Sequence, residues 1–192
     1  MGTFRWIVLP VILIMAGATF NSANADEYTD TVAVFAKSPA VKPFIDNSYG
    51  YAVFPTVGKG GFVVGGSYGT GQVFAQGKVT GTVKLIAGTI GFQAGGQAFS
   101  QIVFFEDKRA YEEFTSGSFE FGADASAVAI TAGVQASAGT GGASAGASAG
   151  PATGKQAKAS YHKGMAVFVH AKGGLMVEAS VGGQKFSFEP KK

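Results

Sequence analysis

Residues 50–64 read Gly-Tyr-Ala-Val-Phe-Pro-Thr-Val-Gly-Lys-Gly-Gly-Phe-Val-Val, two apolar runs joined by a Lys-Gly-Gly step. Residues 164–177 repeat this arrangement as Gly-Met-Ala-Val-Phe-Val-His-Ala-Lys-Gly-Gly-Leu-Met-Val. Glycine supplies the positive φ that a tight turn can require, so each copy predicts a strand, a turn and a strand. We interpret the repeat as one hairpin used twice, with Lys59 and Lys172 at related positions. Two ordinary hairpins whose turn lysines protect sheet edges would give the same pattern, and that alternative stays open.

Short β-compatible runs fill most of the chain on both sides of this segment, separated by glycines or lysines. The 30 glycines among 192 residues agree with many tight turns and close backbone approaches. Met165–Val169 is apolar on both faces and is expected to be a central strand. The pattern predicts an α+β fold that is predominantly antiparallel β, a compact barrel- or sandwich-like domain. The expected strands are 51–54, 61–68, 72–76, 79–86, 89–96, 101–105, 127–136, 165–170, 175–181 and 185–188.

An N-terminal helical segment is expected in two parts. Val32, Phe35 and Ala36 follow the i, i+3, i+4 spacing of one face of the first part. Ser38 is a suitable N-cap and Pro39 a suitable first residue for a second short helix, which would run to about Asp46. The apolar residues expected to pack on the body, or to dip shallowly into a membrane surface, are Val32, Phe35, Phe44 and Ile45.

One mid-chain helix is expected over residues 107–114. Asp107 is its N-cap, Tyr111 and Phe114 share a face, and Gly117 can end it.

The first 25 residues have the three parts of an export signal. Arg5 supplies a positive charge, residues 6–20 are apolar, and Ala23 and Ala25 are small residues that favour a cut before Asp26. We therefore expect a cleaved signal peptide here. The mature protein would be periplasmic or secreted, or peripherally associated with the envelope membrane.

Residues 26–192 are expected to form a single domain, because their number suits one hydrophobic core. Residues 133–154 contain almost only Gly, Ala, Ser and Thr, which is typical of a passive loop. A functional lid or a loop that inserts into a membrane is the alternative interpretation.

The sequence offers no catalytic or metal-binding pattern. It has no cysteine, and His162 and His170 are too far apart on one strand to act together. The carboxylate pairs at 106–107 and 112–113 lie on or beside the expected helix, where adjacent residues do not face each other. Residues 150–156 depart from a phosphate-binding loop in glycine spacing and in the final residue. We expect a protein that is not an enzyme and uses no cofactor. Its net charge of +3 is too small to indicate nucleic-acid binding.

Four segments resemble, in order, motifs of the SYLF lipid-binding family. They are residues 51–66, 95–105, 119–129 and 173–186, so the resemblance covers nearly all of the chain after residue 25. It is closest to the exported bacterial branch of the family. The resemblance implies a compact β-rich domain with flanking helices that binds phospholipid. Eukaryotic relatives bind phosphoinositides and join membranes to actin, partners that the predicted export excludes.

The resemblance and the export signal together imply an anionic phospholipid as ligand, held by surface lysines on glycine-rich turns. No protein partner can be inferred. Each lysine near an anionic membrane contributes about 1 kcal/mol, so several must act together. The leading candidates are Lys59 and Lys172, and the weaker ones are Lys84, Arg109, Lys163 and Lys185.

A small integral outer-membrane β-barrel is the alternative function. Alternating strands and abundant glycine are compatible with it. Several runs are apolar on both faces, however, and Pro190-Lys191-Lys192 stands where such proteins usually end in an aromatic residue.

Overall fold

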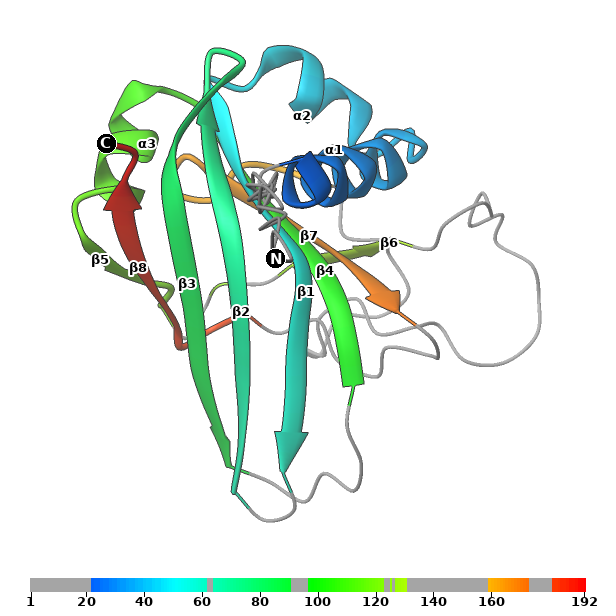
Figure 1. Cartoon of the computed structure of the whole chain (residues 1–192), viewed down its shortest axis with the longest axis vertical. Helices are drawn as coiled ribbons and strands as arrows, with labels where there is room; N and C mark the ends of the chain where they lie inside the picture. Colours follow the sequence, from blue (N-terminus) through cyan, green and yellow to red (C-terminus); the bar gives the residue numbers. More distant parts are fainter. Residues whose placement is uncertain are drawn as a thin grey trace, which may run out of the picture.

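The computed structural model describes residues 22–61, 64–90, 97–122, 125, 127–130, 159–172 and 181–192. These residues form one long, mostly antiparallel sheet with three helices (Figure 1). The elements are α1 (Ser22–Ala36), α2 (Lys42–Asn47), β1 (Gly50–Gly61), β2 (Val64–Ala75), β3 (Lys78–Ile90), β4 (Gln97–Phe105), α3 (Lys108–Phe114), β5 (Ser118–Glu120), β6 (Val128–Ile130), β7 (Met165–Lys172) and β8 (Gln184–Pro190).

The sheet has the strand order β5-β8-β3-β2-β1-β4-β7-β6 and is open, with β5 and β6 at its two ends. All neighbours are antiparallel except β6 and β7. Gln76 and Gly77 join β2 to β3 with φ values of 51° and 76°, the backbone that a two-residue hairpin turn requires. The α+β, predominantly antiparallel class is confirmed, in its sandwich-like rather than its closed form.

The larger core lies on the inner face of the curled sheet, the face that carries Val57, Val103 and Phe186. The sheet curls far enough for Phe54 of β1 and Phe186 of β8 to bring their ring centroids within 5.8 Å. Phe114 of α3 packs against the same ring at 5.0 Å. Helix α3 therefore closes one end of this interior.

A second core lies on the outer face, where α1 and α2 cover β1, β4 and β7. Phe35 and Phe44 are buried there, and Phe44 contacts the rings of Phe104 and Phe168. The prediction that the helices pack on the body is confirmed. Because these aromatic rings are already buried, the same residues are not free to dip into a membrane.

The two helix starts differ in how well they were predicted. Asp107 caps α3 as expected, and its carboxylate accepts a hydrogen bond from the Ala110 backbone N–H at 2.8 Å. The predicted start at Ser38 and Pro39 is wrong, since α2 begins at Lys42. The Ser38 carbonyl instead accepts hydrogen bonds from the next turn, so this segment only connects the two helices.

Strands β1, β2 and β3 are longer than the short runs predicted for them. The glycines that were interpreted as breaks lie inside the strands. A Cβ on Gly69 would lie 2.8 Å from Val57 Cγ2, and one on Gly71 would lie 2.7 Å from Phe54 Cδ1. These glycines let side chains of one strand cross the backbone of the next, so they mark close packing and not turns.

The internal repeat does not give two equivalent hairpins. Its two copies, β1 and β7, lie on either side of β4, but equivalent residues face opposite ways, with Phe54 on the inner face and Phe168 on the outer. The predicted Lys-Gly-Gly turn at Lys59 is wrong, because this segment belongs to β1. Lys172 is the last residue of β7, and the turn predicted after it lies outside the described residues.

Five further predictions fall largely outside the described residues. They are most of the signal peptide, the loop at 133–154, and most of the strands at 89–96, 127–136 and 175–181. The predicted cut before Asp26 falls within α1. No helix in the described part of the chain is both long and apolar enough to cross a membrane.

Candidate functional site

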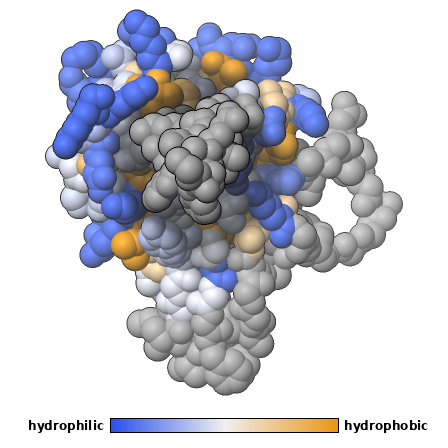
Figure 2. Space-filling view, in the orientation of Figure 1, coloured by the Kyte–Doolittle hydropathy of each residue, from blue (hydrophilic) through white to orange (hydrophobic). Residues whose placement is uncertain are grey.

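Strands β2, β3 and β8 leave part of the outer face uncovered, and two large apolar residues project from it. Tyr68 and Ile86 are directly opposite each other on β2 and β3. Their exposed fractions are 56% and 55%, and no other large hydrophobic residue in the described ranges is exposed. Figure 2 agrees, since hydrophobic residues form only small separate patches on the described surface in that view. An apolar pair in this position needs an explanation beyond chance exposure.

Lysines flank the pair along the neighbouring rows of the sheet. Lys185 of β8 is directly opposite Ile86. In the next row, Lys84 is opposite Thr70, which is opposite Thr56. Lys172 joins this row from β7, because its ammonium donates a hydrogen bond to Thr56 Oγ1 at 2.8 Å. Three of the six predicted lipid-binding residues therefore share one face.

Two of these lysines form exposed ion pairs. Lys84 lies 2.8 Å from Glu189, and Lys185 lies 3.5 Å from Glu120. The hydrogen bond and charge of Glu189 raise the pKa of Lys84, and the same contact lowers the pKa of Glu189. Both side chains therefore stay charged near neutral pH. Exposed pairs of this kind are weak, so each lysine can exchange its glutamate for another anion at little cost.

The row on the other side of Tyr68 and Ile86 has no side chains. Gly60, Gly66 and Gly88 are paired across β1, β2 and β3. A Cβ on Gly60 or Gly88 would meet nothing within 4 Å, so steric crowding does not require glycine there. The result is bare, exposed backbone beside the apolar pair. We call the whole surface the outer strip, defined by Tyr68, Ile86, Lys84, Lys172, Lys185 and these three glycines.

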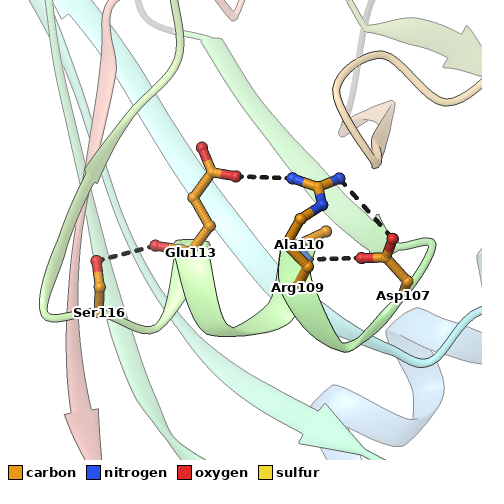
Figure 3. Close-up of polar contacts among 5 residues, drawn as sticks. All are labelled: Asp107, Arg109, Ala110, Glu113 and Ser116. Atoms are coloured by element: carbon orange, nitrogen blue, oxygen red, sulfur yellow. Dashed lines mark hydrogen bonds and ion pairs between the residues drawn. The ribbon is translucent and has the colours of Figure 1, made fainter.

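Arg109, a residue of α3, and Lys163, which lies near it, are at the other end of the molecule. Arg109 forms ion pairs with Glu113 at 3.2 Å and with Asp107 at 3.8 Å (Figure 3). Lys163 belongs to the turn before β7 and has a φ of 53°. A Cβ on the next residue, Gly164, would lie 2.7 Å from Arg109 Nη2, which places the arginine against this turn. The two residues are neighbours but are not part of the outer strip.

Lys59 is separate from both groups. It lies on the inner face with Val57, half-buried and directly opposite Ser67 of β2. No ion pair joins it to another residue in the described ranges. The two leading lysine candidates, Lys59 and Lys172, therefore face opposite sides of the sheet.

His170 is the titratable group beneath α1. It lies on β7, and its ring centroid is 6.5 Å from that of Phe35. Burial lowers the pKa of His170 below its ordinary value of 6.5, and the positive charge of Lys172 lowers it further. Protonation is therefore disfavoured while α1 is packed against β7.

We expect the protein to lose stability as the pH falls from 7.5 to 5, in part through His170. In this window the unfolded chain binds the proton more readily than the folded chain, so stability rises with pH. Urea unfolding at both pH values measures the difference. This difference should become smaller in His170→Gln. An equal pH dependence in His170→Gln and the parent protein would contradict this assignment.

Sequence reasoning found the lysines of the outer strip but missed Tyr68 and Ile86. The alternation of inward-facing and outward-facing residues along β2 and β3 could have identified them, because each lies between two inward-facing neighbours. No group of three His, Asp or Glu side chains that could hold a metal ion occurs among the described residues. The polar chemistry of the outer strip is therefore that of lysine ammonium groups and exposed backbone.

Comparison with known proteins gives two findings. Residues 86–192 match the model of the family Ysc84, described as "Las17-binding protein actin regulator". The chain is also 26% identical over 161 residues to "Beta cell expansion factor A" of Aeromonas veronii. That alignment covers 82% of this chain and 52% of the relative, so the chain spans about half the length of the relative.

Proposed function

The chain belongs to the Ysc84 (SYLF) family, and on that premise we propose that it is a non-catalytic module that binds anionic phospholipid. The observation that carries the proposal is the outer strip, where Tyr68 and Ile86 project between Lys84, Lys172 and Lys185. This combination matches the two layers of a membrane surface. The lysines contact lipid phosphates, while the apolar pair enters the boundary between headgroups and acyl chains.

Binding by the outer strip is peripheral and reversible. A lysine near an anionic surface contributes about 1 kcal/mol, and a fully buried Ile side chain about 1.5–3 kcal/mol. Neither contribution is sufficient alone for stable membrane binding, but the lysines and the apolar pair are held on the same sheet and act together. The bare backbone at Gly60, Gly66 and Gly88 helps by letting lipid approach the apolar pair closely.

We place this function outside the cytoplasm because residues 1–25 have the pattern of an export signal. On this proposal the chain does not share the Las17-related role named in the family description. The check is the N-terminal sequence of protein recovered from outside the cytoplasm, which should begin at Asp26. Recovery of the protein only inside the cytoplasm, starting at Met1, would rule the location out.

The test is co-sedimentation with vesicles of phosphatidylglycerol and phosphatidylcholine. The protein should pellet with the anionic mixture, less so at high salt, and not with phosphatidylcholine alone. Ile86→Glu should weaken binding by at least about tenfold, because it removes apolar contact and adds a negative charge. Glutamate at this position faces Lys185, so the fold should tolerate it.

Ser118→Glu is the control for charge. Ser118 is exposed on β5, directly opposite Ser187. If both variants bind equally, charge alone acts and the apolar pair is not a membrane contact. Equal pelleting of the parent protein with both lipid mixtures would refute anionic recognition. Protein that resists carbonate extraction from native membranes would favour the integral alternative over the peripheral one.

A further inference from the structure

Two carboxylates lie at the margin of the outer strip, each against one of its lysines. Glu120 of β5 is directly opposite Lys185 of β8, and Lys185 is directly opposite Ile86. This row of the sheet therefore runs from a carboxylate to an ammonium and then to the apolar pair. Glu189, near the end of β8, reaches Lys84 of β3 from the neighbouring row, and the two side chains lie 2.8 Å apart. Two of the three lysines in the outer strip are thus already paired with a negative charge.

The third lysine of the outer strip has a neutral neighbour instead. The Lys172 ammonium donates a hydrogen bond to Thr56 Oγ1 at 2.8 Å. A hydroxyl oxygen carries no net charge, so it neither cancels the charge of this lysine nor repels a lipid phosphate. The three lysines therefore meet a membrane on unequal terms, and the difference lies in Glu120 and Glu189.

The ion pairs themselves are only a small barrier to membrane contact. Exposed pairs of this kind are worth little, so a lysine can leave its glutamate. The larger cost comes afterwards, because the released carboxylate stays beside the bound phosphate. The ion pairs measure 3.5 Å for Glu120 and 2.8 Å for Glu189, so a phosphate on the same lysine lies within about 10 Å of the carboxylate. Charges at that separation still repel each other at 0.1 M salt.

We propose that Glu120 and Glu189 are specificity-determining residues that restrict the outer strip to strongly anionic membranes. A selective surface often combines attractive groups for its target with repulsive groups against weaker targets. The lysines attract any anionic membrane, while the two carboxylates oppose contact unless the density of phosphate is high. The inference rests on the proposed function, because it takes the outer strip to be the surface that contacts lipid.

The experiment is co-sedimentation with vesicles in which the fraction of phosphatidylglycerol in phosphatidylcholine increases stepwise. Glu120→Gln with Glu189→Gln should bind about thirtyfold more tightly than the parent protein on the same vesicles, which is about fivefold for each charge removed. Half-maximal binding should therefore move to a lower fraction of phosphatidylglycerol. The matched control is Glu112→Gln with Glu113→Gln, which removes two exposed, ion-paired carboxylates from α3 at the other end of the molecule. The control should gain much less affinity.

A second measurement separates the ion pair from net charge. Lys84→Gln should weaken binding about two- to fivefold more in a Glu189→Gln background than in the parent protein, because in the parent Lys84 must first leave its glutamate. Lys172→Gln should cost the same affinity in both backgrounds, since the neighbour of Lys172 is a hydroxyl. If only net charge mattered, the two lysine variants would respond alike to the loss of Glu189.

Every outcome supports the inference or overturns it, with thermal unfolding showing that each variant is folded. A large gain in the variant of Glu120 and Glu189, with a small gain in the control, would support it. Equal gains in the two double variants, no gain in either, or an equal cost of Lys84→Gln in both backgrounds would overturn it. If the parent protein pellets with phosphatidylglycerol but the gain is absent, only this inference fails. If neither the parent nor the variant pellets with any mixture, the proposed function fails as well.

Discussion

Phe186→Ala is expected to lower the free energy of unfolding by about 3–5 kcal/mol, the usual cost of removing a fully buried aromatic ring. Phe186 is 0% exposed. Its ring centroid lies 5.8 Å from that of Phe54, 5.0 Å from Phe114 and 5.3 Å from Phe121. The contacts come from β1, from α3 and from the segment after β5. One ring therefore joins parts of the sheet that are distant along the chain, and the surrounding residues cannot easily collapse into the space it leaves.

Urea unfolding followed by far-ultraviolet circular dichroism measures this effect. Phe188→Ala is the matched control, since it makes the same change two residues along β8 at a half-buried position. Its loss should be clearly smaller. If Phe186→Ala costs less than about 1 kcal/mol, the sheet is not curled around this ring. Phe188→Ala reports how sensitive β8 is to the loss of an aromatic ring at a less buried position, so it shows whether a small effect is particular to Phe186.

The sequence predicted the elements whose signals are local. The Asp107 cap, the buried Phe35 and the two-sided burial of Met165–Val169 each depend on a few adjacent residues, and each is confirmed. The strand lengths were wrong because Gly69 and Gly71 are required by side chains of another strand. In the sequence, a glycine that makes room for a side chain of the adjacent strand cannot be distinguished from a glycine in a turn.

The position of Lys59 shows why the site was only partly predictable. Alternation counted from the inward-facing Phe54 would place Lys59 on the outer face. The register of β1 shifts between Val53 and Thr56, so Val57 faces inward and Lys59 follows it. Ser100 Oγ donates to the Pro55 carbonyl inside this irregular segment at 2.7 Å. A bulge of one residue reverses every later side chain, and its stabilising contact comes from β4, far away in sequence.

The same limit applies to the outer strip. Lys84, Lys172 and Lys185 come from three strands, and only the strand order brings them together. Composition identified lysine as the main cation but could not show which lysines share a face. The separation of Arg109 and Lys163 from this group follows from α3 lying at the other end of the sheet.

The triple variant Lys84→Gln, Lys172→Gln and Lys185→Gln is expected to weaken binding to phosphatidylglycerol vesicles by about a hundredfold. The three lysines with Glu120 and Glu189 give the outer strip a charge of +1, and their neutral variants leave −2. At about 1 kcal/mol for each charge near an anionic surface, this change of three units is worth about 3 kcal/mol. A tenfold change in affinity corresponds to about 1.4 kcal/mol, so 3 kcal/mol corresponds to the expected loss of about a hundredfold in affinity. The exposed ion pairs contribute little to stability, so the variant should stay folded.

The control for this variant is Lys37→Gln, Lys42→Gln and Lys108→Gln, which removes the same charge from exposed positions on and beside the helices. If membrane binding depends only on net charge, the two triple variants should bind equally and the outer strip is not the contact surface. If the outer strip is the contact surface, the control should lose less affinity, because it leaves Lys84, Lys172 and Lys185 in place. Repeating the sedimentation at 0.5 M salt should bring the three proteins together at the low affinity that Tyr68 and Ile86 provide alone. A residual difference at that salt would show that at least one of the three lysines contacts lipid through more than its charge.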